Sequence, residues 1–150
     1  SGWQWVVWAA LLLLPGAAAA VARVRRQVAI MGIVSNSLPE HFALIHARTG
    51  LLDSFDFHLV HGDYPQAKPH PAPYLAALAL ARVAPQAAIA VEDSERGMRS
   101  ALAAGLRCLV VPHELSRRHD FSGATAVCRD LVEVAERLTA TATYCRNSHS

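Results

Sequence analysis

The fold depends first on residues 87–97, Ala87-Ala88-Ile89-Ala90-Val91-Glu92-Asp93-Ser94-Glu95-Arg96-Gly97. An apolar run of strand length ends here at two adjacent carboxylates, and the residues that follow are typical of a helix start. In open α/β sheets, ligands bind where loops leave the carboxyl ends of the strands. Carboxylates at that edge can hold a hard cation such as Mg2+. Alternatively, Asp93 or Ser94 caps the helix and Glu92 points into solvent.

The composition is that of a single globular domain. The chain has 150 residues, of which 53% are hydrophobic and 17% charged, so it can bury a continuous core. A net charge of +2 without a long basic block excludes an obvious nucleic-acid partner. Three cysteines form no close pair, which favours neither a zinc site nor a disulfide framework and fits a reducing, cytoplasmic compartment: Cys108, Cys128 and Cys145.

The first residues are apolar but do not favour a membrane span. Trp5 to Leu14 is an unbroken apolar run that Pro15-Gly16 interrupts, and positive charge only follows it. A secretory signal is not favoured either, because no basic residues precede the run. We therefore treat residues 1–13 as an apolar N-terminal segment of undecided role. Since the chain opens with Ser1 rather than methionine, it is consistent with a fragment.

Helices and apolar strands alternate along the rest of the chain. Val28 to Val34 is rich in branched residues, as expected of a buried parallel strand, and ends in Ser35-Asn36-Ser37. Ser37 and Glu40 form a capping box for a helix from Leu38 to about Thr49, with Gly50 as its C-terminal residue.

The remaining elements follow the same pattern. Strands are predicted at Phe55–Val60, Ala87–Val91 and Cys108–Val111. Helices are predicted over Ala17–Arg26, after Pro73, between Asp93 and Gly105, and over Arg129–Leu138, whereas Pro112–Gly123 is a polar loop and residues 139–150 are a frayed tail. This alternation predicts an α/β fold, a Rossmann-like parallel sheet with helices on both faces.

Three chemically interesting points follow strands or lead into helices, so they could converge at one edge of this sheet. They are Ser35, the Glu92-Asp93 pair, and Lys68, which stands in a stiff proline-paced loop. Taken alone, Ser35 is a turn hydroxyl and Lys68 a solvated lysine. Together, a hydroxyl, a helix N-terminus, a lysine and carboxylates that bind magnesium describe a phosphate site.

At these positions the chain resembles the haloacid dehalogenase superfamily, in the branch of β-phosphoglucomutase-like and phosphoglycolate phosphatase-like proteins. The second motif of that family, a strand ending in Ser or Thr, is similar to the segment ending in Ser35. The third resembles Lys68-Pro69-His70-Pro71, and the fourth resembles Glu92-Asp93-Ser94 with Gly97. Motif order and spacing agree from about Leu14 to about Leu138, so residues 14–138 are expected to form a partial core domain.

The resemblance implies Mg2+-dependent hydrolysis of phosphate monoesters, or phosphoryl transfer, through an aspartyl-phosphate. It leaves phosphatase and phosphomutase both open, and implies a small phosphorylated metabolite as substrate. Ser35 and Lys68 would stabilise the transition state. The residues implied for phosphate binding are Ser35, Asn36, Ser37 and Lys68, and those for the metal are Asp93 and Glu92.

The departure from the family concerns the nucleophile. The family's first motif, Asp-x-Asp-Gly-Thr on the central strand, is absent, and so is a cap domain. The sheet is then expected to lack its central strand, unless Trp5–Trp8 fills the gap, and open edges would favour association. Without the nucleophilic aspartate the chain alone is expected to be inactive. In this interpretation it is the C-terminal part of a phosphohydrolase. The alternative is a non-catalytic relative that binds a phosphorylated ligand or a protein.

Overall fold

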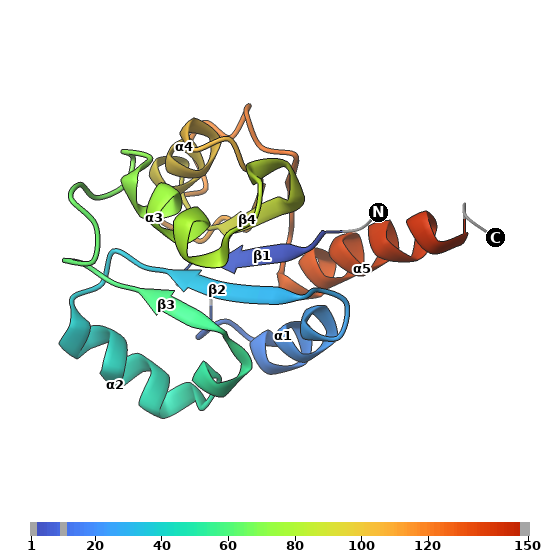
Figure 1. Ribbon diagram of the computed structural model, residues 1–150, viewed down its shortest axis with the longest axis horizontal. Coiled ribbons are helices and arrows are strands. Elements are labelled where there is room, and N and C mark those ends of the chain that lie inside the picture. Colours follow the sequence, from blue (N-terminus) through green and yellow to red (C-terminus); the bar gives the residue numbers. More distant parts are fainter. Residues whose placement is uncertain (1–2, 10–11, 148–150) are drawn as a thin grey trace.

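The computed structural model describes residues 3–9 and 12–147, and its strands form one parallel sheet with helices on both faces (Figure 1). The strand order within this described part is β3-β2-β1-β4-β5-β6, and neighbouring strands pair in parallel throughout. The strands are β1 Trp5–Trp8, β2 Ile30–Val34, β3 Phe57–Leu59, β4 Ala88–Glu92, β5 Arg107–Val110 and β6 Ala126–Val127. The helices are α1 Ala17–Arg25, α2 Pro39–Thr49, α3 Ala72–Ala81, α4 Glu95–Ala103 and α5 Leu131–Asn147, with single 3-10 turns at Leu52–Ser54 and Pro85–Ala87. The predicted fold class is confirmed.

Strand β1 occupies the centre of the sheet. Trp5–Trp8 pairs with β2 on one side and with β4 on the other. The expected gap in the centre of the sheet is therefore filled, and the hypothesis that Trp5–Trp8 fills it is confirmed. All four of its side chains are 0% exposed. A strand with neighbours on both edges and helices on both faces has to be apolar throughout, and this is why the run shows no polar alternation.

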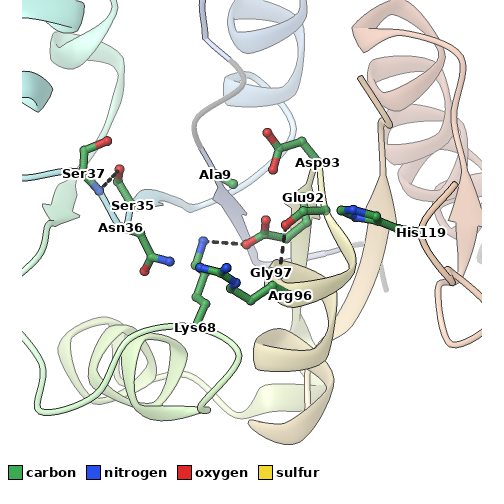
Figure 2. A pocket seen from close by; sticks show the side chains of 11 residues that line it. Ala9, Ser35, Asn36, Ser37, Lys68, Glu92, Asp93, Arg96, Gly97 and His119 are labelled. Carbon is green, nitrogen blue, oxygen red and sulfur yellow. Dashed lines mark hydrogen bonds and ion pairs between the residues drawn. The ribbon is translucent and has the colours of Figure 1, made fainter. Parts of the chain in front are cut away.

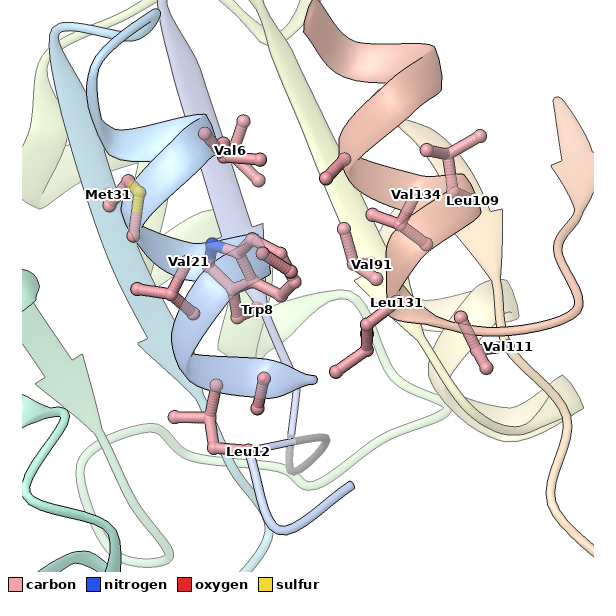
Figure 3. Packing of buried hydrophobic residues seen from close by; sticks show 14 of the residues in the cluster. Val6, Trp8, Leu12, Val21, Met31, Val91, Leu109, Val111, Leu131 and Val134 are labelled. Carbon is pink, nitrogen blue, oxygen red and sulfur yellow. The ribbon is translucent and has the colours of Figure 1, made fainter. Parts of the chain in front are cut away.

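The two faces of β1 contribute to two separate cores. Val6 and Trp8 pack with α1, α2 and α5, and Figure 3 shows Trp8 among Val21, Met31 and Leu131. The opposite face of β1 packs with α3 and α4. Because side chains alternate along a strand, four residues supply both layers of the core.

Several predicted boundaries differ from the observed ones; β3, for example, covers Phe57–Leu59 rather than Phe55–Val60, and α5 begins at Leu131 rather than Arg129. Strand β2 begins at Ile30 rather than Val28, because the N–H groups of Ala29 and Ile30 both bond to the Gln4 carbonyl where the strands first meet. Helix α5 continues to Asn147, whereas the frayed tail was expected from residue 139; residues 148–150 lie outside the described part.

The capping box at Ser37 is also wrong. The N-cap of α2 is Leu38, without a side-chain cap, and the Ser37 N–H instead donates to Ser35 Oγ at 3.0 Å. In contrast, Ser94 caps α4 by accepting from the Gly97 N–H at 3.1 Å, as the helix-cap interpretation predicted. Gly50 ends α2 with a φ of 65°, a conformation that glycine adopts without strain.

Strand β6 was not predicted, because two residues are too short to give a periodic signal. In the described part of the chain, no helix combines the length and the apolar character that a bilayer crossing requires.

Candidate active site

A cavity of about 440 Å³ opens at the carboxyl edge of the central strands β1, β2 and β4 (Figure 2). It brings together all six residues that the sequence singled out: Ser35, Asn36, Ser37, Lys68, Glu92 and Asp93. Its other lining residues are Ala9, Ser94, Arg96, Gly97 and His119. The convergence follows from the parallel sheet, whose strands all end at the same edge.

The loop after β2 is held by hydrogen bonds to β3 and to the segment that follows it, including one from the His61 N–H to the Ser37 carbonyl at 2.9 Å. The Ser35 N–H donates to the Leu59 carbonyl at 2.9 Å, and Ser35 Oγ accepts from Ser37 as described. The Tyr64 hydroxyl donates to the Ser35 carbonyl at 2.6 Å and lies 3.1 Å from Asn36 Oδ1. These contacts fix residues 35–37 at the N-terminus of α2, where backbone N–H groups and the helix dipole favour an anion.

Lys68 and Glu92 form a buried ion pair beneath the cavity. Their residues are 8% and 1% exposed, and Lys68 Nζ lies 2.6 Å from Glu92 Oε1. Lys68 also donates to the Val34 carbonyl at 3.0 Å, and the Tyr74 hydroxyl donates to the same Glu92 oxygen. Burial, and after it the Glu92 charge, raise the pKa of Tyr74, so its hydroxyl stays a donor. A solvated lysine and a solvent-facing glutamate are therefore both excluded.

Gly97 makes room for the Glu92 carboxylate. A Cβ atom at residue 97 would lie 1.9 Å from Glu92 Oε2, well inside any real contact. The first turn of α4 thus passes directly over the carboxylate, which explains the glycine three residues after Ser94.

Asp93 differs from Glu92 in its surroundings. Its side chain is 29% exposed, and Oδ2 lies 3.7 Å from His113 Nε2. Burial, and next the Glu92 charge, raise the pKa of Asp93, whereas His113 and Lys68 act in the opposite direction. Successive residues of an extended strand point to opposite sides, so the pair divides into one buried and one accessible carboxylate.

The accessible carboxylate suits a magnesium ion only in part. Mg2+ binds through one or two carboxylates, with waters and substrate phosphate oxygens completing the set. Asp93 provides one such ligand, while Glu92 is engaged by Lys68 and Tyr74. Among the described residues, no three His, Cys, Asp or Glu side chains group closely enough to hold a metal ion. Of the ligands that a magnesium ion needs, the described residues could therefore supply one carboxylate, that of Asp93.

Ala9 stands at the carboxyl end of β1, where it lines the cavity and its N–H donates to the Val91 carbonyl at 2.9 Å. The family that the chain resembles carries its nucleophilic aspartate at the end of this central strand. A methyl group cannot attack phosphorus, so β1 ends at the cavity without the nucleophile that this resemblance implies.

Sequence reasoning missed Ala9, Arg96 and His119. Placing Trp5–Trp8 beside the second motif would have identified Ala9, since it directly follows that strand. Arg96 follows the capping Ser94 in the first turn of α4, which was a usable signal. His119 comes from the loop after β5, and no local pattern indicates that it reaches the cavity.

Comparison with known proteins agrees with this geometry. The family profile described as haloacid dehalogenase-like hydrolase matches residues 3–105. Protein CbbY of Cereibacter sphaeroides is 34% identical over 127 residues, which cover 83% of this chain and 55% of that protein. Hexitol phosphatase B of Escherichia coli K12 is 38% identical over 100 residues, which cover 67% of this chain and 45% of the enzyme.

The crystal structure of CbbY from Rhodobacter sphaeroides in complex with phosphate is 33% identical and superposes with a TM-score of 0.70, covering 80% of this chain and 55% of that one. The chain thus spans about half the length of the curated relatives it matches. The profile match over most of the chain, together with the shared fold, shows that this protein belongs to the haloacid dehalogenase-like hydrolase family.

Proposed function

We propose that the cavity binds the phosphate group of a small phosphorylated metabolite together with Mg2+, as the substrate half of a phosphatase or phosphomutase site. The observation that carries the proposal is the convergence of Ser35, Lys68 and Asp93 on one cavity at the N-terminus of α2. The relatives' names support it, since one is a hexitol phosphatase and another was solved with phosphate. We further propose that the protein works in the cytoplasm, where its buried free thiols Cys108 and Cys128 stay reduced.

Each polar group has a distinct part in this proposal. A lysine ammonium carries three donors, and Lys68 uses two of them for Glu92 and Val34, which leaves one for a phosphate oxygen. The Ser35 hydroxyl, the Asn36 N–H and the Ser37 side chain would provide further contacts at the helix end, whereas the Ser37 N–H already donates to Ser35 Oγ. When bound, Mg2+ would offset the phosphate charge, and Asp93 is the residue that would hold it.

Ala9 decides how far the chemistry can proceed. Formation of an aspartyl-phosphate in the intact protein requires a carboxylate at the end of the central strand, and β1 presents a methyl group there. A strand supplied from elsewhere would have to displace β1, which is paired on both edges. We therefore propose that the chain alone binds phosphate without turnover. The same residue favours a second candidate function, that of a non-catalytic module that binds a phosphorylated ligand.

Calorimetric titration with inorganic phosphate, with and without magnesium, tests the binding proposal. We expect binding that magnesium strengthens, and we expect Asp93→Asn to remove the magnesium effect while leaving metal-free binding intact. Ser35→Ala should weaken phosphate binding in both buffers. Absence of phosphate binding in every buffer would contradict the proposal.

Hydrolysis of p-nitrophenyl phosphate separates the two candidate functions. The unmodified chain is expected to show no turnover. Replacing both Ala9 and Leu11 by aspartate recreates the Asp-x-Asp pattern at the end of β1, although Leu11 itself lies outside the described residues. A gain of magnesium-dependent turnover in this double variant supports a phosphatase core that lacks only its nucleophile. Turnover by the unmodified chain that Asp93→Asn abolishes would exclude the non-catalytic module.

A further inference from the structure

Asp93 is held in place by the loop that follows β5. Ser116 Oγ donates to the Asp93 carbonyl at 2.6 Å, so the loop is tied to the main chain of this residue. His113 Nε2 lies 3.7 Å from Asp93 Oδ2, so the same loop also reaches the carboxylate. Figure 2 shows Asp93 apart from the Lys68–Glu92 pair, which a dashed line joins. The accessible carboxylate of the cavity therefore has a partner of its own.

The orientation of the His113 ring is fixed within the loop. Its Nδ1 accepts from the Leu115 N–H at 3.1 Å, and its main-chain N–H donates to Ser116 Oγ at 3.0 Å. A neutral imidazole whose Nδ1 accepts a hydrogen bond carries its proton on Nε2, and the charged ring carries a proton there as well. The nitrogen that faces Asp93 is therefore a donor in both states and offers no lone pair to a metal ion.

The contact with His113 makes the two oxygens of Asp93 unequal. At 3.7 Å the two atoms are too far apart for a direct hydrogen bond, but the ring places the positive end of its N–H dipole beside Oδ2. Among the side chains that the structure describes, none donates to Oδ1. Since Asp93 lines the cavity, a cation there meets one open oxygen and one oxygen that a positive group already faces.

We propose that His113 is a positioning residue that restricts Asp93 to one oxygen for the cation, so that the site selects Mg2+ over Ca2+. The inference rests on the proposed function, in which Asp93 holds the cation. Mg2+ demands near-ideal octahedral geometry, which the narrow bite of a two-oxygen carboxylate does not fit. Ca2+ takes about six to eight oxygens and accepts both oxygens of one carboxylate. A carboxylate with one oxygen faced by an N–H group therefore disfavours Ca2+ more than Mg2+.

Metal titrations of the chain saturated with methylphosphonate test this inference. Methylphosphonate replaces inorganic phosphate because calcium phosphate precipitates, and it has no ester bond to hydrolyse. Calorimetry gives the apparent dissociation constants for Mg2+ and Ca2+, and we expect the wild-type chain to bind Mg2+ more tightly. Because loss of a side chain that orients a metal ligand changes metal affinity by about 10–100-fold, His113→Leu should shift the ratio of the two constants toward Ca2+ by about tenfold.

Two further variants separate the N–H donor from other effects of the substitution. His113→Gln keeps a side-chain N–H near the position of Nε2 and should restore the wild-type preference for Mg2+. His41→Leu removes an exposed histidine from α2 and should leave the ratio unchanged. A change in net charge acts on both divalent cations alike, so it cancels in the ratio.

The possible failures can be told apart. Equal affinity of the wild-type chain for the two cations would overturn the inference and leave the phosphate site standing. A His113→Leu chain with the wild-type ratio would also overturn it, as would a His113→Gln chain that behaves like His113→Leu. If methylphosphonate binds but neither cation does, the magnesium part of the proposed function fails and the inference fails with it. If methylphosphonate does not bind, the whole proposed function fails, and the inference with it.

Discussion

Replacing Gly97 by alanine should destabilise this protein, although the same change in an ordinary helix is favourable. Gly97 lies in α4 with helical backbone angles, so alanine would be expected to stabilise the fold by about 1 kcal/mol. The structure reverses this sign. The new Cβ would lie 1.9 Å from Glu92 Oε2 and 2.3 Å from Glu92 Cδ, whereas ordinary contact begins at 3.4 Å.

The carboxylate cannot move away without cost. Glu92 is 1% exposed and its Oε1 is held by Lys68 at 2.6 Å and by Tyr74. Overpacking of a core costs about 1–3 kcal/mol, and separating a buried ion pair costs about 3–5 kcal/mol. After the gain in helix propensity, we expect Gly97→Ala to lower the free energy of unfolding by about 2–4 kcal/mol.

Urea unfolding followed by the fluorescence of the buried Trp5 and Trp8 measures this loss. Ala103→Gly, at an exposed position of the same helix, is the control and should cost about 1 kcal/mol from propensity alone. In a chain that carries Lys68→Met and Glu92→Ala, no carboxylate opposes the methyl group, and Gly97→Ala should become stabilising. A Gly97→Ala protein as stable as the wild type would refute the reasoning.

Three further changes test other parts of the structure. Lys68→Met should lower the free energy of unfolding by about 3–5 kcal/mol, because it leaves the Glu92 carboxylate buried without its ion-pair partner. A loss below about 1 kcal/mol in urea unfolding would contradict a stabilising role of this buried ion pair. Ser94→Ala should cost about 1 kcal/mol by removing a helix cap, whereas Ser37→Ala should cost only a few tenths, since its side chain caps nothing; equal losses in thermal unfolding would count against this difference. Asp56 has a lowered pKa, first because its carboxylate accepts from the Met31 N–H at 2.9 Å. A lowered folded-state pKa stabilises the fold above the unfolded-state pKa, and the gain disappears as the pH falls through the folded-state value. At neutral pH Asp56→Asn should therefore lower the free energy of unfolding by about 1 kcal/mol, a modest figure because the carboxylate is half exposed. In unfolding curves measured at acid pH the variant and the wild type should be equally stable. A difference in stability that does not change with pH would contradict this prediction.

Local patterns were sufficient for most of the α/β arrangement and for the site that it creates. Apolar strands followed by polar residues predicted that Ser35, Lys68, Glu92 and Asp93 meet, and the cavity contains all four. The reason is geometric: parallel strands end at one edge, so residues far apart in the sequence come together without any long-range information. The residues after Glu92 also predicted a helix start with Asp93 or Ser94 as its cap, and Ser94 is the cap.

Features that depend on what packs against a segment could not be derived from local patterns, although the place of Trp5–Trp8 was proposed from the gap in the expected sheet. The run Trp5–Trp8 has no periodicity of its own, and only pairing on both edges makes it the central strand and places Ala9 in the cavity. The two adjacent carboxylates look equivalent in sequence, yet strand geometry buries Glu92 against Lys68 and leaves Asp93 accessible. The sequence by itself determined that these polar side chains meet at one edge of the sheet. Only the tertiary structure decided which of these groups are accessible from the cavity, because burial and ion pairing depend on neighbours that are distant along the chain.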